Sequence, residues 1–392
     1  MTSKPTVQQR GPESPGRATL LELFFDLVYV VALALISQHL AADPTWRGAF
    51  DALLLMMAAW WVWSITALVT DYYDPQRPAM QVLTIAVAFG SLLMAAAIPD
   101  AFGDSGLVFA GSYVVIHVGR GLFLVPGLRG QRVQLRAMRI MLWFMISAVP
   151  WIAGGVADGV AREVLWALAL MIDYGASALR YRLPRLGPIP AGQYNLTAEH
   201  LGERYQQFFI IALGDGILVS GMALSRTDLD NQRVAAFVLA FATTVLLWRI
   251  YVHRAGEVLA TAIERSSRPE RFISTAPLTQ LVMAAGAVAT AAGFKLVIDA
   301  PASPATAAKT AILLGAPALF LIGRARFEYE VFSRVSPNRL IGLVGLAGSA
   351  PLVAGGPLIM AQLAAPVVLV GIAAHDTLRS RAQPPEEPRP PM

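Results

Sequence analysis

Long apolar runs recur along the whole chain, and they limit its fold more than any other feature. Each run holds roughly 20 residues, the length an α-helix needs to cross a hydrocarbon core of about 30 Å, and Pro, Gly, Asp or Arg separates it from the next. Twelve runs can be delimited, at 21–40, 49–70, 80–98, 105–126, 139–156, 161–179, 205–224, 234–254, 275–298, 307–323, 339–355 and 357–375. We therefore predict an all-α, polytopic transmembrane helix bundle of about twelve helices.

Composition supports a protein whose main partner is the lipid bilayer. Of the 392 residues, 56% are hydrophobic and only 15% are charged, whereas soluble domains carry about 25% charged residues. The sequence pI near 9.6 comes from arginines in short loops, so we expect no nucleic-acid partner. With no cysteine, disulfides, thiolate nucleophiles and Cys-ligated metals are excluded.

Basic residues orient the predicted bundle, because cytoplasmic loops carry an excess of Lys and Arg. With the N-terminus inside, the cytoplasmic flanks hold 24 of the 31 basic residues. Five fall on the outer flanks and two, Arg120 and Lys295, within helices. We expect both termini to be cytoplasmic.

The chain divides into two predicted halves with a tail at each end. Residues 1–18 have no apolar core, so they are expected to be a disordered tail rather than a cleavable signal peptide. A first six-helix half at 19–180, a Pro-containing cytoplasmic linker at 181–201 and a second half at 202–376 follow, and 377–392 is expected to be a disordered Pro-rich tail. Similar opening helices suggest a 6+6 tandem repeat, although interfacial aromatics alone could produce that likeness. The tight joint at Gly355-Gly356 leaves a re-entrant hairpin open for the last two segments.

Charged side chains in an apolar run cost about 2.5–3.5 kcal/mol each at a helix centre, so they are candidate functional groups. Glu22 and Asp26 are four residues apart on the first predicted helix and share a face with Tyr29. Neighbouring carboxylates suit a proton relay or a cation site. The alternative for Glu22 is that it only caps the helix N-terminus.

A second set of polar residues opens the seventh predicted helix, with His200, Glu203 and Arg204 at its start and Asp215 near mid-membrane. Asp215 lies between two glycines, which would let a neighbouring backbone, an ion or a water approach. It is our first choice for a functional residue. The alternative is an ion pair to Arg120 or Lys295 that only fixes helix packing.

His117 and Arg120 lie three residues apart and face the same way on the fourth predicted helix. Arg120 is expected to neutralise one of the carboxylates, and His117 to relay protons or to bond a backbone carbonyl. A weaker group of titratable residues is expected at the membrane interface or in loops: Asp173, His253, Glu257, Glu328 and Glu330.

Several catalytic motifs are absent from the sequence. It contains no GxxxxGK[ST], HExxH, GxSxG or CxxC pattern. ATP-driven pumping within this chain and standard hydrolase mechanisms are therefore not indicated. No catalytic residue, metal ligand or cofactor is assigned, and enzymatic activity is left open but not favoured.

Three stretches resemble the bacterial low temperature requirement A (LtrA) family: Leu21-Glu-Leu-Phe-Phe-Asp-Leu-Val-Tyr-Val30, His200-Leu-Gly-Glu-Arg204 and Phe209-Ile-Ile-Ala-Leu-Gly-Asp215. The resemblance covers about 18–375. Two departures stand out, since the family usually has Glu-Ser where this chain has Asp215-Gly216, and a His before Leu-Pro where it has Thr275-Ala276-Pro277. The resemblance implies a multi-pass bacterial membrane protein, and it implies no particular activity.

The leading hypothesis is a secondary transporter or an ion or proton conduit in the bacterial inner membrane, acting on a small solute or ion. Glu22, Asp26 and Asp215 would line its path, with Arg120 and Arg204 as counter-charges. One alternative is a membrane enzyme acting on lipid or isoprenoid substrates, with the carboxylates and His200 as acid–base groups. A second is a structural or stress-response membrane component, and the oligomeric state is left open.

Overall fold

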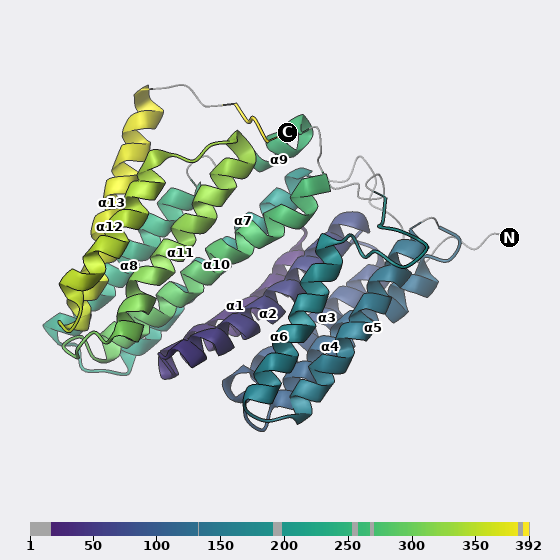
Figure 1. Ribbon diagram of the computed structural model, residues 1–392, viewed down its shortest axis with the longest axis horizontal. Helices are drawn as coiled ribbons and strands as arrows, with labels where there is room; N and C mark the ends of the chain where they lie inside the picture. Colours follow the sequence, from purple (N-terminus) through teal and green to yellow (C-terminus); the bar gives the residue numbers. More distant parts are fainter. Residues whose placement is uncertain are drawn as a thin grey trace. The chain divides into compact units, whose positions relative to one another are not determined.

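The computed structural model describes residues 17–131, 133–190, 198–252, 258–266, 270–382 and 387–391. Within these ranges the chain forms thirteen α-helices and a single 3₁₀ turn, η1 (Figure 1). The helices up to the middle of the chain are α1 (Leu20–Ala42), α2 (Trp46–Tyr72), α3 (Pro78–Ala96), α4 (Gly106–Gly127), α5 (Gln134–Val156) and α6 (Val160–Ala178), with η1 at Ile98–Asp100. The later ones are α7 (Ala198–Ser225), α8 (Asn231–Val252), α9 (Val258–Arg265), α10 (Glu270–Asp299), α11 (Ala307–Phe332), α12 (Pro337–Val353) and α13 (Leu358–Ala382).

All twelve predicted segments are helices, and the short α9 is an additional one in the described part. Ten of the described helices are long and apolar enough to cross a membrane. The other two long helices, α6 and α12, are not among these candidates. Helix α6 carries three charged residues, Arg162, Glu163 and Asp173, and α12 is too short because it has 17 residues. The structure thus supports a polytopic all-α bundle with ten candidate spans rather than twelve.

The chain ends differ from the predicted tails where they are described. Helix α13 continues to Ala382, so the beginning of the 377–392 segment is helical and the boundary predicted at 377 is too early. An apolar helix extends readily into its polar flank, because each added residue gains a backbone hydrogen bond. Most of the N-terminal tail predicted at 1–18 lies outside the described residues.

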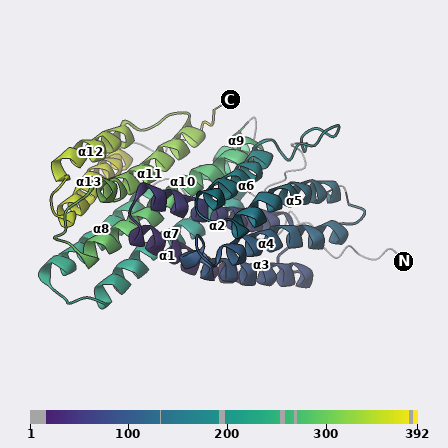
Figure 2. The ribbon, with the colours of Figure 1, turned by 60° about the horizontal axis from the view of Figure 1, so that its bottom comes forward.

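The chain divides into two compact units. The first comprises Met1–Leu35 and Leu53–Arg204, and the second comprises Ile36–Ala52 and Tyr205–Met392. Within the first unit, helices that are neighbours in sequence are neighbours in space: α3 packs on α4, α4 on α5 and α5 on α6 (Figures 1 and 2). Short connections of this kind produce antiparallel neighbours.

In the second unit α10 packs on α11, α12 lies against α11 and α13, and α8 contacts α10 and α13. The joint between α12 and α13 turns at Gly355, whose φ of 76° favours glycine. Four backbone hydrogen bonds join the turn to residues 301–305, the shortest from the Ala305 amide to the Gly356 carbonyl at 2.8 Å and from the Leu358 amide to the Ser303 carbonyl at 2.9 Å. The last two segments are therefore two full helices joined by an anchored turn.

Close backbone contact between α10 and α11 depends on a glycine. A Cβ atom added at Gly286 would lie 2.5 Å from the backbone nitrogen of Phe320 and 2.9 Å from the carbonyl oxygen of Ala316. We expect Gly286→Ala to lower the free energy of unfolding by about 1–3 kcal/mol, because two helix backbones must separate. Thermal unfolding in detergent measures this change.

The matched control is Gly315→Ala on α11. A Cβ atom added at Gly315 meets nothing within 4 Å, so this variant should be as stable as the parent or up to about 1 kcal/mol more stable. Equal stability of Gly286→Ala and Gly315→Ala would contradict the close contact.

Candidate functional site

A buried histidine in the first unit lies between two carboxylates. The Nδ1 atom of His200 is 3.0 Å from Oδ1 of Asp71, and its Nε2 atom is 3.3 Å from Oε2 of Glu22. The three residues are 0–2% exposed. They lie at helix ends, since Glu22 is in the first turn of α1, Asp71 in the last turn of α2 and His200 in the first turn of α7.

Glu22 also caps α1, as the alternative interpretation of this residue proposed. The backbone amide of Thr19 donates to Oε2 of Glu22 at 2.8 Å, and the Thr19 hydroxyl donates to the same oxygen at 3.0 Å. The amide of Glu22 in turn donates to the Thr19 hydroxyl at 3.3 Å, which completes a capping box. The carboxylate therefore serves the cap and His200 together.

One helical turn further along α1, Asp26 forms a bidentate ion pair with Arg204. The Arg204 Nη1 and Nη2 atoms donate to the two oxygens of Asp26 at 2.7 and 2.8 Å. The indole of Trp63 donates to Oδ1 of Asp26 at 2.8 Å, and the guanidinium lies 5.5 Å from the centroid of the Trp63 ring. All three residues are at most 2% exposed. The two charges thus neutralise each other inside the protein, and a buried charge needs such a partner.

Protons can be counted in the triad of Glu22, His200 and Asp71 (the carboxylate–histidine triad). Each nitrogen-to-oxygen contact needs one hydrogen, and a neutral imidazole has only one N–H. Either His200 is protonated and both carboxylates are ionised, or His200 is neutral and one carboxylate carries the second proton. Both arrangements give the triad one net negative charge, and they differ only in where a proton lies along a hydrogen bond.

The remaining first-unit candidates lie apart from the triad's hydrogen bonds. The Glu203 Oε2 atom accepts from the Ala18 amide at 3.0 Å. Tyr29 is fully buried, and its hydroxyl lies 3.2 Å from that of Ser91 on α3. Glu22, Asp26 and Tyr29 are thus all engaged, each with partners of its own.

Arg120 does not pair with a carboxylate in the described part of the chain. Its Nη2 atom donates to the Thr66 hydroxyl at 2.7 Å, and no described residue accepts from Nε or Nη1. His117 stacks on Phe144 with centroids 3.9 Å apart, and neither ring nitrogen has a hydrogen-bond partner among the described residues. The counter-charge role expected for Arg120 is therefore not seen, because Arg204 occupies the position beside Asp26.

Three residues expected at the interface or in loops are buried in helices, so this expectation was wrong. Asp173 is 2% exposed and accepts from the Tyr113 hydroxyl at 2.8 Å and the Trp151 indole at 3.3 Å. Glu328 and Glu330 are 6% and 8% exposed within α11. Neighbouring helices supply the hydrogen bonds that make their burial tolerable. His253 and Glu257 lie outside the described residues.

Asp215 is fully buried in the second unit. Its Oδ1 atom accepts from the Ser37 hydroxyl at 3.1 Å, and Oδ2 has no partner among the described residues. A Cβ added at Gly216 would lie 3.3 Å from both Thr244 and Phe294, so neighbouring side chains approach as the glycine suggested. Lys295 pairs with Asp299 at 2.6 Å instead of with Asp215.

Sequence reasoning missed Asp71, Trp63 and Thr19. Asp71 ends the second apolar run, and the predicted topology puts that end on the same side of the membrane as Glu22 and His200. The spacing of Thr19 and Glu22 is that of a capping box. Nothing in the sequence marks Trp63, because its contact with Asp26 depends on how α1 packs on α2.

The fold and the site define a class: multi-pass membrane proteins of helical bundles with buried ion pairs. Within the class, this chain belongs to the bacterial low temperature requirement A protein family (LtrA), whose family model matches residues 17–374. It is 35% identical over 344 residues to a protein of Rhizobium meliloti (strain 1021) named "Uncharacterized protein RA0937", covering 86% of this chain and 83% of that protein. No solved structure matches. The resemblance expected from the three sequence stretches is confirmed.

Proposed function

We propose that this protein moves a small solute or ion across the bacterial inner membrane, coupled to proton binding at the carboxylate–histidine triad. The position of His200 between Glu22 and Asp71 is the observation that carries the proposal. Buried ionisable groups in membrane helices are costly, and they commonly mark proton relays and ion pathways. The adjacent pair of Asp26 and Arg204 supplies a second set of charges within one helical turn.

The proposed mechanism uses a change in the proton count of the triad. With two protons both hydrogen bonds of His200 are satisfied. Release of one leaves a nitrogen facing an ionised oxygen with no hydrogen between them and adds a second negative charge. Because that arrangement is repulsive, the helix ends that carry Glu22, Asp71 and His200 would separate, which gives the protein two states of different charge.

The triad also supports six crossings in the first half of the chain. The end of α2 and the start of α7 both contribute to it, so the four helices between them must return the chain to the same side. Helices α3, α4 and α5 supply three crossings, so an even number requires that α6 also spans the membrane, although it carries charged residues. With the excess of arginine on that side, we propose that the triad lies near the cytoplasmic surface and that both termini are cytoplasmic.

Asp215 is the proposed counterpart in the second half. Like Asp26 it is a buried carboxylate on the helix that opens one half of the chain, although it lies past the middle of α7. A carboxylate on the opening helix of each half agrees with a 6+6 tandem repeat. Among the described residues its partner is the Ser37 hydroxyl, which compensates little of the cost of burying an ionised carboxylate. We propose that Asp215 exchanges a proton or contacts the transported cation.

Proton flux into proteoliposomes tests the proposal. A pH-sensitive dye trapped inside the liposomes reports proton entry while a membrane potential is imposed. The measurement is made with and without a small-molecule fraction of bacterial cell extract outside the liposomes. We expect flux in the parent protein and at least a tenfold loss in His200→Gln and Asp71→Asn, because neither retains the two-proton arrangement. Asp26→Asn and Asp215→Asn should also abolish flux.

The control is Asp299→Asn, which makes the same chemical change at a half-exposed ion pair on α10. It should conduct like the parent, and gel filtration should show folded protein for every variant. Unchanged flux in folded His200→Gln protein, or no flux in the parent under either condition, would refute the proposal.

A further inference from the structure

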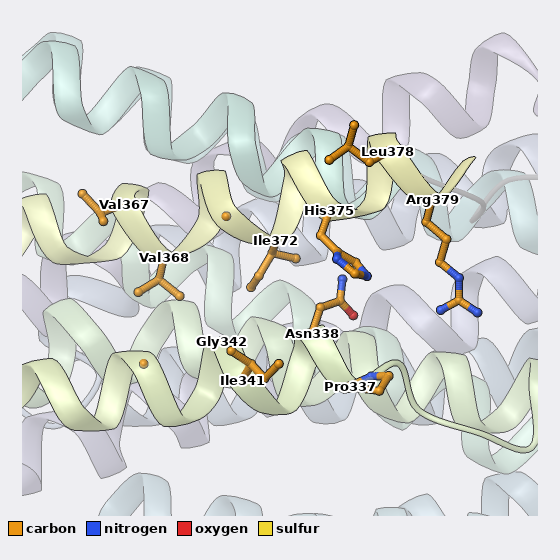
Figure 3. A pocket seen from close by; sticks show the side chains of 12 residues that line it. Pro337, Asn338, Ile341, Gly342, Val367, Val368, Ile372, His375, Leu378 and Arg379 are labelled. Atoms are coloured by element: carbon orange, nitrogen blue, oxygen red, sulfur yellow. The ribbon is translucent and has the colours of Figure 1, made fainter. Parts of the chain in front are cut away.

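Two hollows in the second unit differ in what lies over them. The described residues that line a groove of about 820 Å³ all belong to α12 and α13, and Figure 3 shows apolar side chains such as Val368 and Ile372 along it. A smaller pocket, of about 180 Å³, lies between α10 and α11. Its lining includes Pro391, which belongs to the last described segment of the chain. This pocket therefore has a cover that comes from outside the two helices.

The covered pocket contains a polar wall. On α11, the Nε atom of Arg326 donates to Oε1 of Glu330 at 3.2 Å, and the Thr279 hydroxyl of α10 donates to the same oxygen at 2.8 Å. Glu330 is 8% exposed, whereas the Arg326 side chain is 49% exposed. Thr275 on α10 lines the pocket as well. The cover thus lies where a solute would approach a buried carboxylate.

Residues 387–391 bind the end of α11 through backbone groups. The Arg389 amide donates to the Val331 carbonyl at 2.9 Å, and the Ser333 hydroxyl donates to the Arg389 carbonyl at 2.6 Å. Val331 is in the last turn of α11, where helix carbonyls have no partner within the helix. The segment therefore supplies a hydrogen bond that the end of this helix lacks.

The composition of the segment suits an extended, bound conformation. Three of its five residues are prolines, which have no amide hydrogen and a fixed φ, so ordering them costs little entropy. The prolines are half-buried, while Glu387 and Arg389 are exposed. Glu387 pairs with Arg265 at 3.0 Å, and the segment lies beside α9 (Figure 1). The apolar rings thus face the protein and the charges face outward.

We propose that residues 387–391 are a releasable strap, which covers the pocket beside Glu330 when bound and uncovers it on release. The contacts that hold the strap are two hydrogen bonds and an exposed ion pair, each of which is weak by itself. A form with the strap released, populated at about 0.1–10%, is expected for so small a difference in free energy. The chain thus carries its own ligand for this surface.

Thiol labelling measures the release, because the chain has no cysteine of its own. Thr275→Cys puts a single reporter in the pocket, and Ser225→Cys puts one at the exposed end of α7 as a control. A bulky maleimide is added, in detergent, to the full chain and to a chain shortened to end at Ala382. We expect Thr275→Cys to react at least tenfold faster in the shortened chain, and Ser225→Cys to react at the same rate in both.

Two substitutions at one position test the backbone contact. Arg389→Pro removes the amide hydrogen that bonds Val331, whereas Arg389→Ala keeps it and removes only an exposed side chain. With the Thr275→Cys reporter, Arg389→Pro should react like the shortened chain and Arg389→Ala like the parent.

A variant on the other side of the contact gives an independent reading. Ser333→Gly removes the hydroxyl donor and suits the φ of 56° at this position, so the fold of α11 should be kept. Labelling of Thr275→Cys should become about fivefold faster, the effect of one hydrogen bond.

Equal labelling of Thr275→Cys in the full and shortened chains would overturn the proposal, as would equal labelling in Arg389→Pro and Arg389→Ala. Faster labelling of Ser225→Cys in the shortened chain would also contradict it, because the segment would then stabilise the whole unit instead of covering one pocket.

Discussion

Arg204→Met is expected to lower the free energy of unfolding by about 3–5 kcal/mol. The guanidinium makes two hydrogen bonds to Asp26, and both residues are at most 2% exposed. Removing it leaves a buried carboxylate that still accepts from the Trp63 indole but has lost its counter-charge, and uncompensated buried charges have costs of this size. Thermal or denaturant unfolding in detergent, followed by tryptophan fluorescence, measures the loss.

A second substitution separates charge from packing. Asp26→Asn removes the stranded charge and keeps an acceptor for Trp63, so the double variant with Arg204→Met should be more stable than Arg204→Met alone. The control is Arg233→Met, which breaks a pair with Asp230 at 2.8 Å whose carboxylate is 47% exposed, and should cost less than about 1 kcal/mol. If Arg204→Met costs no more than Arg233→Met, the buried ion pair is not what holds α1 to α7.

The second large effect is expected from Arg339→Met in the other unit. Arg339 is 1% exposed and joins three helices, because it donates from α12 to Glu328 on α11 at 3.0 Å and to Asp376 on α13 at 2.7 Å. Its removal strands two carboxylates rather than one. We therefore expect a loss at the upper end of about 3–5 kcal/mol, or failure to accumulate as folded protein.

Comparison with an exposed arginine makes this result specific. Arg265 on α9 pairs with Glu387 at 3.0 Å, and the two side chains are 47% and 73% exposed. Arg265→Met should cost less than about 1 kcal/mol. Asp376→Asn should restore part of the stability lost in Arg339→Met, and the absence of any recovery would contradict the charge explanation.

The two arginines bear on the proposed function in different ways. Arg204 lies beside the triad, so its replacement should also impair proton flux in protein that remains folded. Arg339 lies in the network that ties α11, α12 and α13 together, and no transport role is proposed for it. A variant of Arg339 that folds and conducts normally would therefore agree with the proposal, whereas a folded and fully conducting Arg204 variant would not.

Much of the candidate site could be predicted because charge in an apolar run is costly. Glu22, Asp26, His200 and Arg204 were chosen for that reason, and the structure brings them together within the first unit. Asp71 was not chosen from the sequence, because a carboxylate at the end of an apolar run is common at a membrane surface. Its role depends on the meeting of three helix ends, a tertiary property.

Two glycines show the same limit of prediction from the sequence. Gly371 and Gly286 look alike in sequence, each within an apolar helix. In the structure a Cβ at Gly286 would collide with the backbone of α11, and one at Gly371 would meet nothing within 4 Å. The first glycine is needed for helix packing and the second is not, and only the packed neighbours distinguish them.

By itself the sequence determined that the chain is a helical membrane bundle and placed its long helices. The physical reason is local: a run of apolar residues in lipid must satisfy its backbone hydrogen bonds within its own segment, so length and composition suffice. Tertiary structure alone decided which charges are paired. In the sequence Arg204 stands at the start of a predicted helix and Arg339 beside a loop. The packed helices bury both, because a partner at hydrogen-bond distance on another helix is what stabilises a buried charge.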